Sequence, residues 1–194
     1  MSVILDGTGA GYRAKVDDRN RVKVNGTVRE ELLEASYDGR AFNINSEAIT
    51  FTTTGSDLPL LYVKNNDTRD LVLTNFFINQ SNRATEADAD IFRLYASPSA
   101  GTSNDIIANG TDVTVVNRKV GTPNAFNVVA KKGGEGFDAT FAEPPMFYGF
   151  NTGFSNVLVN YVIPTGQSVV VVADRLSTTG DVYVGFNGYI SAGE

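Results

Sequence analysis

The sequence predicts an all-β fold, an antiparallel β-sandwich of jelly-roll type that is preceded by an extended N-terminal arm. Short runs rich in Val, Ile, Leu, Tyr and Phe recur along the chain, and clusters of Gly, Pro, Asn and Asp separate them at short intervals. No long stretch keeps the 3.6-residue apolar spacing of a helix. Because 194 residues suffice for one core, we expect an arm over residues 1–35, with a possible short helix, and a sandwich over residues 36–194.

The N-terminal arm has few apolar residues that could form a core, and it carries a cluster of positive charge. Residues 1–26 hold short apolar pairs among Gly, Asp and Arg, and their valines favour strand pairing on another surface over a purely entropic tail. Residues 12–29 contain six basic and two acidic side chains, whereas the whole chain has a net charge of -6. We expect these basic residues to dock the arm on an acidic surface: Arg13, Lys15, Arg19, Arg21, Lys23 and Arg29.

One helix is predicted where the arm meets the sandwich. Thr27-Val-Arg-Glu30 matches a capping box, and residues 30–35 can form one or two turns before Tyr37-Asp-Gly39 ends them. The glycines at 7, 9 and 11 do not predict a phosphate loop, because Tyr12 stands where the third glycine of that motif belongs and no apolar helix follows.

The central strands are predicted from alternation and turn chemistry. Residues 41–54 alternate well with a break near Asn45-Ser46, which allows two strands or one strand with a bulge. Residues 58–78 predict a hairpin, in which Asn65-Asn66-Asp67 is the turn between strands at 60–64 and 71–78.

The remaining strands are expected at 91–96, 113–117, 126–130, 157–163, 168–173 and 181–190. The run Val169–Val172 is typical of a strand buried on both faces. Two connections resemble functional loops without completing a motif. The acidic side chains of 79–90 lack the glycine and glutamate offsets of a calcium loop, and 131–136 lacks the end of a P-loop, so we expect a solvated loop and a flexible tip.

Residues 137–154 concentrate aromatic side chains around Pro144-Pro145, and we expect this segment to be irregular. It either caps the end of the sandwich or forms a subunit or ligand contact, since aromatic residues dominate such surfaces. A sugar-binding platform is less favoured because the chain has no Trp. The residues expected at a subunit interface are Phe141, Phe147, Tyr148, Phe150 and Phe154.

Composition excludes several functions. The chain has no His and no Cys, so it lacks the usual base of a nucleophilic triad, thiolate chemistry and the commonest metal ligands. The acidic balance disfavours nucleic acid as a partner, and no apolar run is long enough to span a membrane. We expect no catalytic residues, no cofactor and no metal. The start of the chain shows no secretory signal, which predicts synthesis and folding in the cytoplasm.

Four segments together resemble a known family. They are DGTGAGYRAKVDDRNRVKVNGTVREE (6–31), AFNINSEAITF (41–51), LPLLYVKNNDTRDLVLTNFFI (58–78) and NYVIPTGQSVVVVAD (160–174). In this order they are similar to small β-sandwich structural proteins of tailed bacteriophages. The resemblance implies a virion protein, and we expect a capsid cement or decoration protein that binds the major capsid protein. Capsid lattices offer many three-fold positions, so a homotrimer is expected. The alternative is a tail, neck or fibre component that binds carbohydrate receptors.

Overall fold

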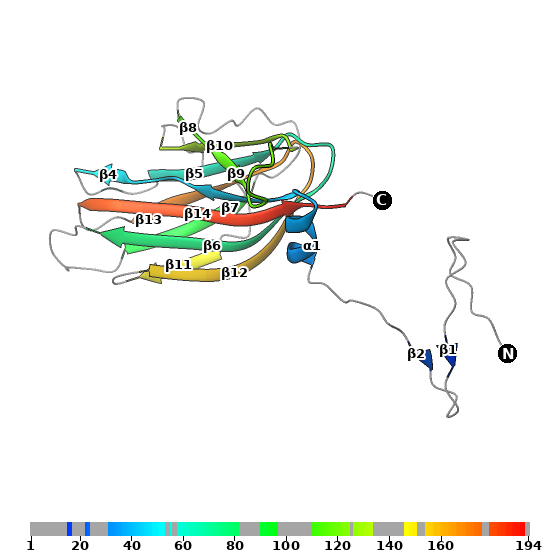
Figure 1. Ribbon diagram of the computed structural model, residues 1–194. Helices are drawn as coiled ribbons and strands as arrows, with labels where there is room; N and C mark the ends of the chain where they lie inside the picture. The colour runs from blue at the N-terminus through cyan, green and yellow to red at the C-terminus, as the bar shows by residue number, and fades with distance from the viewer. Residues whose placement is uncertain are drawn as a thin grey trace. The chain divides into compact units, whose positions relative to one another are not determined.

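The computed structural model describes residues 15–16, 22–23, 31–52, 55, 58–81, 90–96, 110–124, 126–133, 146–150, 154–175 and 179–192. The chain divides into two units, residues 1–30 and 31–194 (Figure 1). In the first unit, strands β1 (Lys15–Val16) and β2 (Val22–Lys23) pair antiparallel, with Lys15 opposite Lys23.

The second unit consists of two antiparallel sheets and one helix, α1 (Glu31–Tyr37). The first sheet has the order β11-β7-β13-β5-β10-β8. Its strands are β5 (Leu58–Asn65), β7 (Asp90–Ala96), β8 (Thr111–Val113), β10 (Val128–Lys132), β11 (Met146–Phe150) and β13 (Ser168–Arg175). The second sheet has the order β12-β6-β14-β3-β9, and β4 also pairs with β14. Its strands are β3 (Ala41–Asn45), β4 (Ile49–Phe51), β6 (Leu71–Ser81), β9 (Val115–Asn117), β12 (Phe154–Ile163) and β14 (Gly180–Ile190).

The strand pairing is that of a jelly roll, which confirms the predicted fold class. Eight strands pair from the outside inward along the chain: β3 with β14, β5 with β13, β6 with β12, and β7 with β11. This nested ribbon closes into two packed sheets when β14 also pairs with β6 and β13 with β7. Strands β8, β9 and β10 are inserted between β7 and β11, and they extend both sheets on one side.

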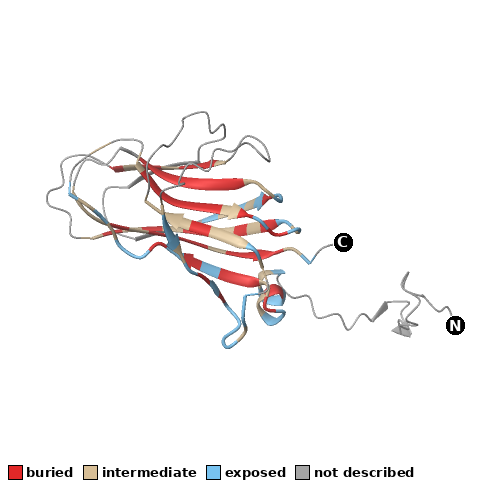
Figure 2. Ribbon diagram, turned by 90° about the horizontal axis from the view of Figure 1, so that it is seen from above, coloured by how far each residue is buried: buried red, intermediate tan, exposed pale blue. Residues whose placement is uncertain are grey.

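The core lies between the two sheets, and buried residues follow the strands (Figure 2). Its largest members, including Phe42, Phe76, Phe92 and Phe186, are at most 1% exposed. The Phe76 and Phe186 rings lie 5.4 Å apart. A second buried cluster of Tyr62, Tyr95, Val170 and Val172 lies on the first sheet. Val169–Val172 are therefore buried on both faces of β13, as the apolar run predicts.

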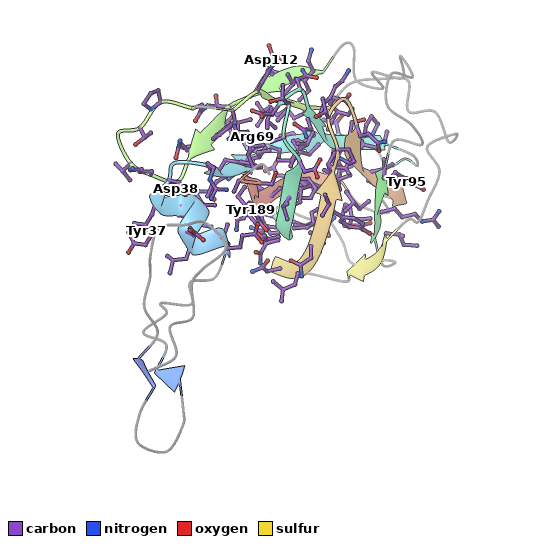
Figure 3. The ribbon with its side chains drawn as sticks, turned by 90° about the vertical axis from the view of Figure 1, so that its right-hand side faces the viewer. Tyr37, Asp38, Arg69, Tyr95, Asp112 and Tyr189 are labelled. Carbon is purple, nitrogen blue, oxygen red and sulfur yellow. The ribbon has the colours of Figure 1, made fainter. Side chains whose placement is uncertain are left out.

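The predicted hairpin over residues 58–78 is wrong, because β5 and β6 belong to different sheets. The polar cluster between them makes a corner instead of a tight turn. The Asn65 amide donates to the carbonyl oxygens of Arg69 and Ile163, each at 2.8 Å, and accepts from the Asp67 N–H. The Asp67 carboxylate accepts from the Arg69 side chain at 3.0 Å and from the Asn127 N–H at 3.1 Å. These bonds fix a crossing from one sheet to the other (Arg69 in Figure 3).

Three further expectations are corrected. The predicted strand 113–117 breaks at Thr114 into β8 and β9, which enter different sheets. The aromatic segment is not irregular throughout, since Met146–Phe150 pair with β7 and Phe154 begins β12. Pairing with β7 gives the backbone of Met146–Phe150 hydrogen-bond partners. Lys131 and Lys132 belong to β10, not to a loop tip.

Other expected elements are confirmed. The predicted helix is observed as α1, and Gly39 ends it with a positive φ of 74°, a conformation that glycine adopts without strain. Two strands, Ala41–Asn45 and Ile49–Phe51, form where the sequence allowed either two strands or one strand with a bulge. Helix α1 packs on the second sheet through Ala35, which clusters with Ala41 and Tyr189.

Candidate functional site

The two sides of the sandwich end in different kinds of edge strand. On one side the sheets end in β8 and β9, which have three residues each and are separated by Thr114 alone. Short edge strands protect a protein from strand addition. On the other side they end in β11 and β12, which have five and ten residues and contain no charged side chain. We call this second side, β11 with β12, the uncharged edge (Figure 1).

Strand β12 exposes apolar side chains along the uncharged edge. Leu158 is 72% exposed and Val162 is 58% exposed. On the opposite face of the same strand, Ile163 is buried, and Val159 and Tyr161 pack against the core. The pairing with β6 shifts between Leu158 and Tyr161, and Asn160 adopts a positive φ of 50° in the shift. This irregularity interrupts a ladder that would otherwise be a regular template for another strand.

The outward face of the second sheet carries rows of asparagines. One row crosses five strands in register: Val116, Asn43, Asn187, Asn75 and Leu158. The next row is Asn45, Gly185, Phe77 and Asn156. We call the outward asparagines of these strands the amide face: Asn43, Asn45, Asn75, Asn79, Asn156 and Asn187.

The second sheet is also almost free of charge. Strands β3, β4, β6, β9, β12 and β14 contain a single charged residue, Asp181, although one residue in five is charged in the chain as a whole. The Asp181 carboxylate accepts a 2.6 Å hydrogen bond from Thr50. The first sheet, in contrast, contains Lys64, Asp90, Arg93, Asp112, Lys131, Lys132, Asp174 and Arg175. Charge depletion on one exposed sheet is a property of contact surfaces.

A hollow of about 300 Å³ borders the amide face where β3 and β9 meet β8. Asn43, Asn45 and Thr114 line it together with Glu47 and Asp112. The two carboxylates are more than four-fifths exposed, and each has a lysine partner: Lys132 lies 3.1 Å from Glu47 and Lys131 lies 3.6 Å from Asp112. Glu47 has a positive φ of 57°, an uncommon conformation for a residue with a side chain.

Among the described residues, two ionisable groups have shifted pKa values, and both serve the fold. Burial and a hydrogen bond with Glu31 raise the pKa of Tyr189 to about 12. The hydrogen bond from Arg69 is the main cause that lowers the pKa of Asp67. Tyr189 lies beside α1, and Asp112 marks the distant β8 side of the sandwich (Figure 3). Neither shifted group lines the hollow.

The predicted site residues fall into different parts of the chain. Of the basic arm residues, Lys15 and Lys23 lie on β1 and β2, and Arg13, Arg19, Arg21 and Arg29 lie outside the described residues. Of the predicted interface residues, Phe147, Tyr148 and Phe150 are on β11 and Phe154 begins β12, so all four belong to the strands of the uncharged edge. Phe141 lies outside the described residues.

Sequence reasoning missed the amide face. The signal was available in Phe42-Asn-Ile-Asn45 and in the asparagines of residues 75–79, because asparagine is depleted in strands and here recurs at outward positions. Asn43, Asn187 and Asn75 line up only through the register of three strands that are distant in sequence. Turn residues do not predict that register.

Within the described part of the chain, no three His, Cys, Asp or Glu side chains gather as a candidate metal site. No helix among these residues is long and apolar enough to cross a bilayer. Comparisons with protein-family models, with curated proteins and with solved structures find no match for this chain.

Proposed function

We propose that this protein is a structural component of a tailed-bacteriophage virion, a capsid cement or decoration protein that attaches to the major capsid protein as a homotrimer. The observation that carries the proposal is the uncharged edge. The family resemblance of the arm and the strand segments supports a role in a phage virion. The uncharged edge offers a surface suited to self-association.

Strand β12, the long strand of the uncharged edge, lacks two of the usual protections, charged side chains and proline, and its ladder is interrupted at the shift between Leu158 and Tyr161. Natural proteins place charged side chains, proline or very short strands at exposed edges, because open backbone groups otherwise recruit other chains. Strand β12 has ten residues and neither charge nor proline. Full burial of an exposed leucine or valine side chain contributes roughly 1.5–3 kcal/mol. Contact through Leu158 and Val162 would therefore stabilise an oligomer substantially.

Oligomerisation would strengthen attachment to a repeating shell. A single domain of 20.8 kDa offers a contact patch of roughly 800 Å². Linking three copies makes the second and third contacts intramolecular, so avidity can exceed single-site affinity by about 10²–10⁴.

The arm fits an acidic partner surface. The pairing of β1 with β2 sets Lys15 directly opposite Lys23, and like charges in this position are destabilising unless an opposite charge offsets them. We expect arm docking to weaken as salt increases, because exposed charges are screened beyond about 8–10 Å at ordinary ionic strength.

A second candidate is a tail, neck or fibre component with a carbohydrate-binding role. The amide face is the specific observation that favours it, because side-chain amides both donate and accept hydrogen bonds with hydroxyl groups.

Analytical ultracentrifugation of the full chain tests the assembly surface. We expect the wild-type protein to sediment at three times 20.8 kDa, and Leu158→Lys and Val162→Lys to shift it to the monomer. Leu33→Lys is the matched control, because Leu33 is 48% exposed on α1 and lies outside the edge. Equal masses for the Leu158→Lys and wild-type proteins would contradict a contact through β12.

A further inference from the structure

We propose that the amide face and the adjoining hollow form a binding site for an uncharged, hydroxyl-rich polymer, a neutral polysaccharide chain. This inference does not depend on the proposed capsid role, because the residues that carry it, Asn43, Asn187 and Asn75, lie on β3, β14 and β6; Asn156 of β12 belongs to both the amide face and the uncharged edge. It also does not depend on the position of the protein in the virion.

The first step is the hydrogen-bonding capacity of the central row. Asn43 and Asn187 are neighbours in register, and their side chains form no hydrogen bond with another described residue. Asn75, the next residue in the row, uses its amide N–H on Asn156 at 3.3 Å and keeps its own oxygen. Each amide offers two donor hydrogens and one acceptor oxygen. Neighbouring strands lie about 4.8 Å apart, so successive amides of the row are also about 4.8 Å apart.

The second step is that the side chains of Asn43 and Asn187 contribute no hydrogen bond to the described residues of the sheet, whereas Asn75 bonds Asn156 of the neighbouring strand. Asparagine is unfavourable in strands, where β-branched and aromatic residues pack better. Three asparagines in one cross-strand row therefore weaken the local preference for strand. Asn45, in the next row, accepts a hydrogen bond from the Glu47 N–H at 3.0 Å, which accounts for its oxygen but leaves the amide nitrogen to other partners.

The third step is an aromatic side chain among the amides. Phe77 faces Gly185 across the strands, and a methyl group built on Gly185 would lie 2.0 Å from Cζ of Phe77. The ring therefore reaches over the glycine, between Asn45 and Asn156 in the same row. An aromatic ring beside hydrogen-bonding amides suits a sugar, which has apolar C–H faces and hydroxyl edges.

The fourth step is the charge of the site. The strands of the second sheet carry one charged residue, Asp181, which accepts a hydrogen bond from Thr50, so they offer no cationic partner to an anionic polymer. The only strong charges at the hollow are the exposed carboxylates of Glu47 and Asp112 and their lysine partners. A carboxylate accepts two hydrogen bonds at once, which suits two neighbouring hydroxyl groups. Because each carboxylate is offset by its lysine partner, the hollow has no net positive charge that would attract an anionic chain.

Affinity electrophoresis of the full-length protein tests the inference, with dextran, glucomannan and arabinoxylan as neutral polymers and alginate as the anionic one. We expect at least one neutral polymer to retard the wild-type protein and alginate not to do so. Asn187→Ala should weaken the retained affinity about two- to tenfold, because one lost hydrogen bond has a net value of about 0.5–1.5 kcal/mol. The triple variant Asn43→Ala/Asn75→Ala/Asn187→Ala should lose about tenfold or more.

Asn127→Ala is the control, because Asn127 is exposed but precedes β10 of the first sheet. It should bind as the wild type does. Far-UV circular dichroism and the sedimentation mass of each variant show whether fold and assembly are intact. Failure of all three neutral polymers to retard the wild-type protein would overturn the inference, and so would equal retention by the triple variant. A triple variant that loses self-association would identify the face as a protein contact and would also overturn it. If an asparagine variant keeps the sedimentation mass of the wild type, its loss of polymer binding is not caused by lost self-association through the uncharged edge.

Discussion

Replacing Asn65 by alanine should destabilise the sandwich strongly, because this side chain ties the corner between the two sheets. Asn65 is fully buried and makes three hydrogen bonds: two donated to the carbonyl oxygens of Arg69 and Ile163, and one accepted from the Asp67 N–H. Each is worth about 1 kcal/mol net, and a buried carbonyl left without a partner adds to the loss. We expect Asn65→Ala to lower the free energy of unfolding by roughly 2–4 kcal/mol.

Urea denaturation followed by far-UV circular dichroism measures this loss. In thermal denaturation, this loss of unfolding free energy should lower Tm by roughly 4–16 °C for a domain of this length. Asn66→Ala is the matched control, because Asn66 is the exposed neighbour in the same corner, and it should change stability by less than about 0.5 kcal/mol. If the two variants differ by less than the error of the measurement, the corner does not depend on the Asn65 amide and our reasoning about the crossing is wrong.

Two further predictions concern the second sheet. Gly185→Ala places a methyl group 2.0 Å from Cζ of Phe77 and 2.5 Å from the Ile44 carbonyl oxygen. It should lower the free energy of unfolding by roughly 1–3 kcal/mol. Adding Phe77→Leu to the same chain should restore only part of this loss, because the contact with the Ile44 carbonyl oxygen stays. Because the Tyr189 pKa is raised to about 12 in the folded state, the unfolded chain releases this proton first, and stability should fall as pH rises from about 10 to 12. Tyr189→Phe should remove that part of the pH dependence in urea titrations at about pH 9 and about pH 11, and an unchanged slope would exclude Tyr189 as its source.

The sequence predicts the fold class well because strand composition and turn residues are local signals. Alternation located β3, β4, β7 and most of the C-terminal strands, and Val169–Val172 indicated a strand buried on both faces. Pairing is not local. Residues 58–65 and 71–81 look like a hairpin because their connection is short and rich in Asn and Asp, yet the same residues serve a corner when the buried Asn65 reaches the distant Ile163.

The candidate site was predicted only in part, for a related reason. Aromatic density at 137–154 drew attention to a segment that contributes β11 and the start of β12, but the same density suggested irregular structure. The amide face depends on the register of β3, β14 and β6, which are separated by long stretches of chain. No pattern within a single strand aligns Asn43 with Asn187 and Asn75.

A reconstruction of the virion that carries this protein tests the central proposal most directly. We predict density for clusters of three sandwiches on the outer surface of the capsid, with the β11–β12 edges in contact and the N-terminal arms on the major capsid protein. Isolated single sandwiches on the shell, or density confined to the tail, would contradict the proposal.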